Sequence, residues 1–211
     1  MGNTSDAGLL ELMNAYAVFH QGHPGADVDA FCRHRLARNG SAPGVNVDGL
    51  PVEAQMGRML GRLSRMAQLY AKKVLQPLNV ANLEDFSYLA TLRRMDKPRK
   101  GELIRSLFSE TTSGTSVIKR LVDQGWVQEL NDPEDGRSVR VRVTPKGQRV
   151  LEKCFPRMQQ TSRMIFGLLS PDERSTLFAL LKKLDGPHAK LLIERREDSF
   201  DELVEALYGK R

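Results

Sequence analysis

Between Gly101 and Val150 the apolar residues change from a helical spacing to a strand spacing, and this change constrains the fold more than any other feature. Two segments place apolar residues at i, i+1, i+4 and i+5, which is one face of an α-helix. They are Leu103, Ile104, Leu107 and Phe108, then Val117, Ile118, Leu121 and Val122. Val139, Val141 and Val143 then alternate with polar residues, the period of a half-buried strand. The stretch therefore predicts two short helices, a β-hairpin and the start of another helix.

The ends of these elements have their own signals. The hydroxyl residues Thr111 to Ser113 are candidate N-caps for the second helix, and Gly125 is its expected C-terminal stop. Trp126 follows directly, and we expect it to anchor the turn into the hairpin. Between the strands, residues 131–136 read NDPEDG, a composition that favours a tight turn.

The polar face of the second helix carries short hydroxyls and cations, and no acid occurs on this helix before Asp123. These residues are Thr112, Ser113, Thr115, Ser116, Lys119 and Arg120. Small donors let a helix approach a phosphate-lined groove closely, and cations neutralise phosphates. Residues 136–149 add five cations and no acid, namely Arg137, Arg140, Arg142, Lys146 and Arg149. Such a run can be a solvated basic face, but after this helix pair it indicates the wing of a winged helix-turn-helix.

The segment Leu121–Gly147 resembles the signature of the MarR family (multiple antibiotic resistance regulator) of bacterial transcription factors. The family pattern is a helix ending in Leu-x-x-x-Gly-Leu-Val, an Asp-Pro-x-Asp-x-Arg wing tip and a strand closing on Leu-Thr-x-x-Gly. The residues that match the tip and the close are Asp132, Pro133, Asp135, Arg137, Thr144 and Gly147. Trp126 and Val143 stand where the family has leucine, and Gly136 replaces a common arginine, which removes one wing cation.

The resemblance implies a mainly α fold with a small β-hairpin wing, in which N- and C-terminal dimerisation helices flank a winged helix-turn-helix core. We expect residues 81–144 to form the DNA-binding domain, and residues 51–80 and 145–211 the helical dimerisation region. The implied function is binding of double-stranded DNA by a homodimer at a pseudo-palindromic operator, as a cytoplasmic repressor released by a small ligand.

The expected DNA contacts are the six polar residues of the second helix together with Arg140 and the wing tip. Arg137 at the tip is suited to the minor groove, where readout depends on groove width and negative potential. Asp135, two residues earlier, is the expected ion-pair partner that orients the Arg137 guanidinium before it meets DNA.

In the family, small aromatic or phenolic effectors bind between the dimerisation helices and the DNA-binding lobe. The matching apolar candidates are Met66, Tyr70 and Phe86, and Arg62 or Arg65 is suited to a ligand carboxylate. No cofactor is expected.

The flanking sequence predicts further helices, at Val52–Leu75, from Asn82, from Thr144–Pro145 to Leu168, from Pro171 to Leu184, and at Ala189–Tyr208. Asp185, Gly186 and Pro187 are expected to break the chain between the last two. Residues 1–50 predict two short helices and contain five acids and three arginines. Their net charge is −2 while the whole chain carries +6. This segment is therefore expected to pack on protein in the dimer and not on DNA.

Composition and motifs narrow the classes of function that remain. A pI of about 9.5 favours a polyanionic partner, and no apolar run reaches the length of a membrane span or forms a secretory signal. The sequence contains neither a Gly-rich phosphate-binding loop nor an activated-nucleophile motif, so we do not expect an enzyme. The spacing of His20, His23, Cys32 and His34 matches no common zinc site, so packing roles are expected.

Two alternatives stay open. Cys32 lies beside a cationic run, which favours a reactive thiolate and hence a redox-switched repressor, although a half-buried structural thiol is the simpler interpretation. Cys154 falls on the apolar face of a predicted helix and is expected in the core. The winged helix could also serve protein contact, but a protein-binding wing would not need five cations without an acid.

Overall fold

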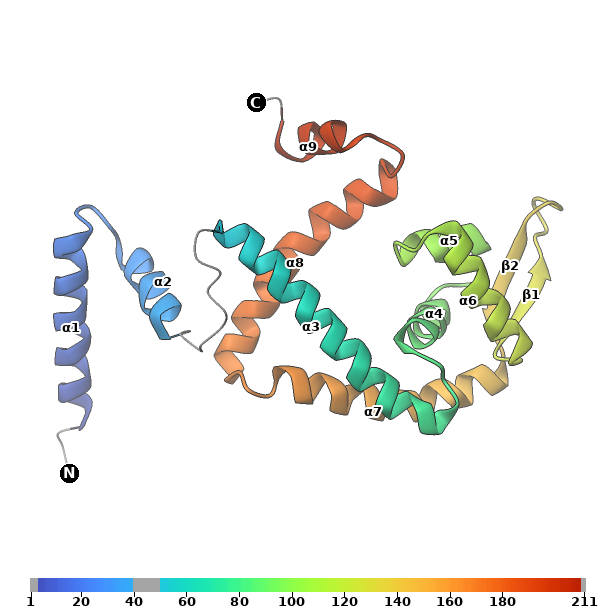
Figure 1. The fold of residues 1–211 in the computed structure, drawn as a ribbon, viewed down its shortest axis with the longest axis horizontal. Helices are drawn as coiled ribbons and strands as arrows, with labels where there is room; N and C mark the ends of the chain where they lie inside the picture. The colour runs from blue at the N-terminus through green and yellow to red at the C-terminus, as the bar shows by residue number, and fades with distance from the viewer. Residues whose placement is uncertain (1–3, 40–49, 210–211) are drawn as a thin grey trace. The chain divides into compact units, whose positions relative to one another are not determined.

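The computed structural model describes residues 4–39 and 50–209, apart from the side chains of residues 4–7, 33 and 36–39. The chain divides into two compact units, residues 1–56 and 57–211 (Figure 1). The first elements along the chain are α1 (Thr4–Gly22), α2 (Val28–Asn39), α3 (Val52–Leu75), the 3-10 turn η1 (Gln76–Leu78) and α4 (Leu83–Arg94). The remaining elements are α5 (Lys100–Ser106), α6 (Thr111–Asp123), β1 (Val127–Asn131), β2 (Val139–Val143), α7 (Pro145–Phe166), α8 (Pro171–Glu194) and α9 (Phe200–Tyr208). The predicted mainly α class with a β-hairpin is confirmed.

In the first unit, α1 and α2 pack through aromatic rings. Phe19 and Phe31 are buried, with ring centroids 5.5 Å apart. The ring of His23 stacks on Phe19 at 4.4 Å, and the ring of His34 lies 4.9 Å from Phe19. The histidines therefore have the packing role expected from their spacing. Cys32, in contrast, is exposed and not half-buried.

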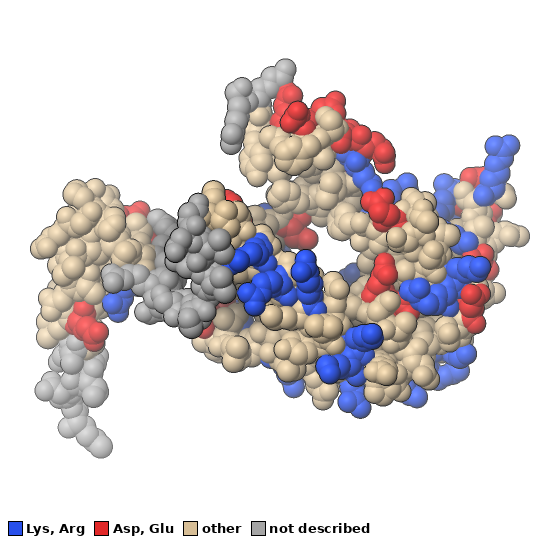
Figure 2. All heavy atoms as spheres, viewed as in Figure 1, with Lys and Arg blue, Asp and Glu red and all other residues tan. Residues whose placement is uncertain are grey.

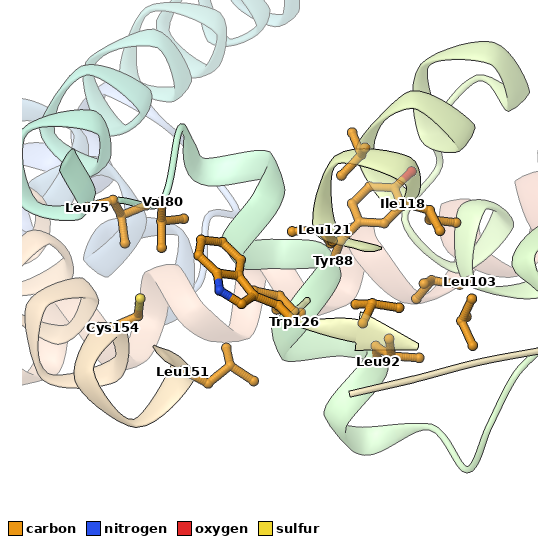
Figure 3. Close-up of a cluster of buried hydrophobic side chains, with 14 of the residues drawn as sticks. Leu75, Val80, Tyr88, Leu92, Leu103, Ile118, Leu121, Trp126, Leu151 and Cys154 are labelled. Atoms are coloured by element: carbon orange, nitrogen blue, oxygen red, sulfur yellow. The ribbon is translucent and has the colours of Figure 1, made fainter. Parts of the chain in front are cut away.

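The core of the second unit gathers side chains from α3, α4, α5, α6, the hairpin and α7 (Figure 3). Trp126 is buried in this core, as its position after Gly125 predicted. Tyr88 of α4 is also buried, beside Ile118 and Leu121 of α6. Cys154 is buried as expected.

The helix pair α5–α6 forms as predicted, and its boundaries have clear causes. Gly125 adopts a left-handed backbone with φ +69°, which glycine permits at low energy. Its N–H donates to the Val122 carbonyl at 2.8 Å, and the N–H of Trp126 donates to Leu121 at 2.9 Å, a Schellman motif. The N-cap prediction was wrong: Glu110 occupies that position, because Thr111 already has helical backbone geometry.

The hairpin pairs β1 with β2 in antiparallel register, with Val127 opposite Val143. Val141 is fully buried, in keeping with the predicted alternation. The N–H of Val141 also donates to the carbonyl of Pro98 at 3.0 Å, and a β-bridge joins Arg99 to Arg140. The segment before α5 therefore extends the small sheet and ties the wing to the helix pair.

The expected chain break at residues 185–187 was wrong, because α8 continues through Pro187 to Glu194. An internal proline removes one N–H donor, while the hydrogen bonds of neighbouring turns remain. The break falls instead at residues 195–199, where Ser199 and Glu202 form the capping box that starts α9.

Large apolar side chains remain exposed along the terminal helices. They include Met56, Met59, Leu60 and Leu63 of α3, and Phe178, Leu180, Leu184 and Ile193 of α8. Met56, Met59, Leu60 and Leu63 follow the i, i+3, i+4, i+7 spacing of one helix face, and an exposed apolar face of this kind is a candidate interaction surface. In the part of the chain that the structure describes, no helix combines the length and apolar character that a bilayer span requires.

Candidate nucleic-acid interface

The outer face of α6 presents its hydroxyl residues and Lys119 to solvent. Thr112, Ser113, Thr115, Ser116 and Lys119 are all exposed, as the sequence pattern predicted. The hydroxyl of Thr115 donates to the Thr111 carbonyl at 2.8 Å, and that of Ser116 donates to Thr112 at 3.0 Å. Their oxygens stay available as acceptors on a surface with little bulk, which a groove can approach closely.

The inner face of α6 is positioned by close packing at Gly114. A Cβ atom placed there would lie 2.6 Å from the Tyr88 hydroxyl and 2.7 Å from a side-chain carbon of Ile104. Real Cβ contacts are essentially never this short, so a glycine is required for α4 and α5 to approach α6. This requirement was not evident from the sequence, because Gly114 stands among the hydroxyl residues of the polar face.

Arg120 is held by a carboxylate from another helix. Its guanidinium forms a bidentate ion pair with Asp85 of α4, with Nε 3.0 Å and 3.2 Å from the two carboxylate oxygens. Asp85 is buried, whereas the Arg120 side chain is 39% exposed. Hydrogen bonding to Asp85 raises the pKa of Arg120. This partner was not predicted from the sequence, because Asp85 lies on another helix, 35 residues before Arg120.

The wing is organised around the buried carboxylate of Asp132. The Nε–H of Arg99 donates to it at 2.6 Å, the Nε of Arg140 lies 3.1 Å away, and the N–H of Glu134 donates at 3.0 Å. Burial alone would raise the pKa of Asp132, but these hydrogen bonds and charges lower it to about 2. Arg140 also donates to the Lys97 carbonyl and to Glu134, both at 3.2 Å. Arg140 is therefore part of the internal network of the wing.

The expected ion pair at the wing tip was wrong. One oxygen of Asp135 accepts the backbone N–H of Arg137 at 3.0 Å, and the other accepts the Ser138 hydroxyl at 2.7 Å. These bonds, that from Ser138 first, lower the pKa of Asp135. Among the described residues, no ion pair joins the Asp135 carboxylate to the Arg137 guanidinium. A carboxylate two residues before an arginine reaches its backbone more easily than its distant head group, so Asp135 shapes the turn.

The tip itself is basic and exposed. Arg137 lies at the exposed end of the hairpin. Further from the tip, Arg142 of β2 donates two hydrogen bonds to the Gln128 side-chain oxygen, at 3.2 Å and 2.9 Å. Figure 2 shows basic side chains at the projecting hairpin tip and, interspersed with acids, over the neighbouring helices.

The closing Thr-x-x-Gly of the family signature has a clear packing role. The Thr144 hydroxyl donates to the Gly125 carbonyl at 2.7 Å and accepts the Gly147 N–H at 3.1 Å, which caps α7. A Cβ on Gly147 would lie 2.2 Å from the carbonyl oxygen of Trp126. These residues join the end of α6, the hairpin and α7 in one close contact.

A cavity of about 860 Å³, here called the α3–α4 cavity, lies between α3, α4 and the segment after α5. It is lined by Arg65, Gln68, Leu69, Lys72, Asn82, Leu83, Glu84, Ser87, Tyr88, Leu107 and Ser109. The Tyr88 hydroxyl is buried and has no well-formed hydrogen bond within the described residues. Desolvation raises the pKa of Tyr88, and the Ser109 side chain offsets part of the rise.

Of the five predicted ligand residues, Arg65 alone lines this cavity. The α3 face that borders it follows the i, i+3, i+4, i+7 pattern of residues 65, 68, 69 and 72. Arg62, Met66 and Tyr70 are outside the lining, and Phe86 packs edge-on against Phe155 at 5.7 Å. The lining combines the apolar Leu69, Leu83 and Leu107 with the cations Arg65 and Lys72, and the ligand-binding role of the five residues stays a prediction.

The two thiols differ in environment. Burial raises the pKa of Cys154 to about 11. The thiolate is the reactive form of cysteine, so burial of Cys154 disfavours that form, whereas Cys32 is exposed.

Known proteins resemble this chain in sequence and in fold. A family profile described as a winged helix DNA-binding domain matches residues 82–147. The chain is 32% identical over 114 residues to the uncharacterized HTH-type transcriptional regulator YkoM of Bacillus subtilis, covering 54% of this chain and 73% of YkoM. It is 29% identical over 130 residues to the multiple antibiotic resistance protein MarR of Escherichia coli, covering 61% of this chain and 90% of MarR.

Solved structures agree. A mutant E. coli MarR complexed with operator DNA matches with a TM-score of 0.58 and 29% identity, over 62% of this chain and 93% of that one. The wing signature, the helix pair and these relatives lead to one conclusion. The chain belongs to the MarR family of winged-helix regulators, which are DNA-binding transcription factors and not enzymes.

Proposed function

We propose that the protein is a repressor that binds a pseudo-palindromic operator as a homodimer, with α6 in the major groove and the wing tip in the minor groove. The observation that carries this proposal is the exposed hydroxyl and lysine face of α6, next to a hairpin whose exposed tip is Arg137. In a two-fold dimer the two α6 helices lie about one turn of DNA apart, roughly 34 Å.

The contacts of the free protein divide the predicted DNA-binding residues into two groups. The first contacts DNA and comprises Thr112, Ser113, Thr115, Ser116, Lys119 and Arg137. The second positions the first: Arg120 fastens α6 to α4, Arg140 fastens the wing to residue 97, and Asp135 shapes the tip. Arg120 and Arg140 each form an ion pair with a carboxylate, and this ion pair would have to break before the guanidinium could bind phosphate. A positioning role is therefore favoured for both.

The exposed apolar residues of α3 and α8 support the homodimer. A single chain leaves them in water, and burial of apolar area stabilises association by about 25 cal/mol per Å². The terminal helices of a second copy would cover them, as the domain prediction for residues 51–80 and 145–211 requires.

Footprinting on the DNA upstream of its own gene tests the proposal. Arg137→Ala should weaken operator binding by roughly 1–3 kcal/mol for each arginine–DNA interaction that the substitution removes. The slope of the logarithm of the binding constant against the logarithm of salt concentration should fall in magnitude by about two units if both wing tips meet phosphate. Asp135→Ala should weaken binding less, since the tip turn loosens while the cation remains. Tighter binding by Asp135→Ala together with unchanged affinity for Arg137→Ala would contradict the wing mechanism.

We also propose that the α3–α4 cavity takes a small aromatic or phenolic acid that releases DNA. Arg65 and Lys72 can meet a carboxylate, and the buried Tyr88 hydroxyl can meet a phenolic oxygen. A panel of such acids should raise the Tm and weaken operator binding. Arg65→Ala should abolish both effects, while the matched control Arg62→Ala, outside the lining, should keep them. Equal loss in both variants would place the ligand elsewhere.

A further inference from the structure

A residue beyond α8 contacts the turn between the two helices of the helix-turn-helix. One guanidinium nitrogen of Arg196 donates to the Ser109 carbonyl at 2.9 Å, and the other donates to the Glu110 carboxylate at 2.8 Å. The partners are 87 and 86 residues apart in the sequence. Arg196 lies well outside residues 82–147, where the family profile matches. The contact therefore joins the C-terminal segment to the winged-helix core.

The turn that Arg196 contacts has an unfavourable backbone. Phe108 has φ +53° and is 45% exposed, so a bulky residue occupies the left-handed region without burial in compensation. Such a conformation persists only where neighbouring contacts over-determine it. Ser109 contributes one of these, since its N–H donates to the Ile104 carbonyl at 3.2 Å. The Phe108 N–H contributes another by donating to the Arg105 carbonyl at 3.0 Å, and Arg196 adds a bond to the Ser109 carbonyl from outside the helix pair.

The turn also sets the start of α6. Glu110 is the N-cap residue, and its carbonyl accepts the Gly114 N–H at 2.8 Å. Thr112 and Ser113, the first proposed DNA contacts, follow within three residues. Any rotation of the turn therefore changes the direction in which the N-terminal end of α6 enters a groove.

We infer that Arg196 is a positioning residue for DNA reading: it holds the strained turn at residues 108–110, and so makes the orientation of α6 depend on the C-terminal segment. This inference rests on the proposed function, whose regulation it describes. Leu107 and Ser109 also line the α3–α4 cavity, so a ligand there and Arg196 act on the same turn.

The charge of the segment suggests a rival interpretation. Acidic side chains gather over α9 and the residues before it (Figure 2), among them Glu197, Asp198, Asp201, Glu202 and Glu205. Acids near the recognition helix would repel DNA, in which case the Arg196 contact would be inhibitory. The geometry favours positioning, because Arg196 bonds the turn itself and leaves the outer face of α6 exposed.

Arg196→Ala in the full-length chain tests the inference, with Arg195→Ala as the matched control. Both remove one positive charge from adjacent positions, but the Arg195 guanidinium bonds within its own segment, to Asp198 at 2.6 Å. Arg196→Ala should raise the operator Kd roughly tenfold, the scale of one charge-assisted hydrogen bond. Its salt slope should match that of the wild type, because the proposed role of Arg196 involves no phosphate. Arg195→Ala should change neither quantity.

Hydrogen exchange without DNA provides a readout independent of the proposed function. The Gly114 amide should exchange roughly tenfold faster in Arg196→Ala and at the wild-type rate in Arg195→Ala. A double-mutant cycle measured by operator binding adds a second check. When Arg196→Ala and Glu110→Ala are combined, the loss of operator affinity should be smaller than the sum of the two separate losses.

Unchanged exchange, unchanged Kd, or tighter binding by Arg196→Ala would each overturn the inference, the last in favour of inhibition. If the wild-type chain binds no operator while the exchange difference is found, the proposed function fails and the contact with the turn stands.

Discussion

At the scale of single residues, Asp132 determines how the hairpin tip is held. It is the acid at which Arg99, Arg140 and the Glu134 amide meet, and it is buried. A carboxylate surrounded by donors is stabilised in its charged form even where solvent is excluded. The Asp of the family wing signature is therefore explained by the geometry of the turn and not by contact with DNA.

The low pKa of Asp132 makes this contribution pH-dependent. The pKa is about 2 in the folded chain and about 3.9 in an unfolded one, so it is depressed on folding. The stabilisation is therefore present above pH 4 and lost as pH falls from about 4 to 2. Asp132→Asn should lower the Tm at pH 7, and the difference from wild type should shrink across that window. A difference that stays constant down to pH 2 would argue against this role.

Gly147 gives a second prediction at this scale. Because a Cβ would lie 2.2 Å from the Trp126 carbonyl, Gly147→Ala must displace α7 or the end of α6. We expect a decrease of about 2–3 kcal/mol in the free energy of unfolding, measured in urea. Gly101→Ala is the control, since nothing lies within 4 Å of its added carbon and alanine favours helix. A Gly147→Ala variant as stable as the control would show that the contact relaxes easily.

At the scale of elements, α6 is fastened at three places along its length. Arg196 contacts the turn before it, Gly114 admits Tyr88, and Arg120 pairs with Asp85. The last contact joins α6 to α4 across 35 residues of sequence. We therefore expect these three contacts to set the orientation of the face of α6 that is proposed to read DNA.

Arg120→Ala should leave the buried Asp85 carboxylate without its partner. Removing one member of a fully buried pair costs about 3–5 kcal/mol, and the exposure of Arg120 reduces this to about 2–3 kcal/mol. The Arg120→Ala variant should have a lower free energy of unfolding in urea titrations and also a lower affinity for the operator. Lys119→Ala, on the exposed face, should lose affinity and salt dependence with little change in stability. The converse pattern would mean that Arg120 contacts phosphate directly.

The boundaries of most elements could be predicted because their causes are local. Asn82 caps α4 by accepting the Asp85 N–H, and Gly125 ends α6 with its left-handed backbone, as each residue type suggested. The failures have a different origin. Pro187 looked like a break, but the neighbouring turns of α8 remain intact around it. Glu110 was overlooked as an N-cap because glutamate is not among the residue types that usually occupy this position.

At the scale of the whole molecule, the N-terminal unit leaves apolar residues uncovered. Leu9, Met13 and Val18 of α1 are each more than half exposed, although Phe19 packs on α2. We therefore expect these side chains to be buried between protomers, as the proposed role of residues 1–50 requires.

Deleting residues 1–38 should weaken the dimer, measured as a higher dissociation constant by analytical ultracentrifugation. The double substitution Leu9→Asn with Met13→Asn should act in the same direction while the α1–α2 packing around Phe19 and Phe31 is kept. A dissociation constant unchanged in both variants would exclude the extension from the interface.

The sequence by itself determined the helix pair, the hairpin and the family, because spacing, caps and turn residues act between neighbours in the chain. Only the tertiary structure decided the roles of the charged groups. Arg120 meets Asp85, Arg99 meets Asp132 and Arg196 meets Glu110 across 33 to 86 residues. Likewise the α3–α4 cavity takes its walls from three separate segments. A cation looks the same in the sequence whether it faces DNA or a buried carboxylate, since the partner is chosen by folding and not by proximity along the chain.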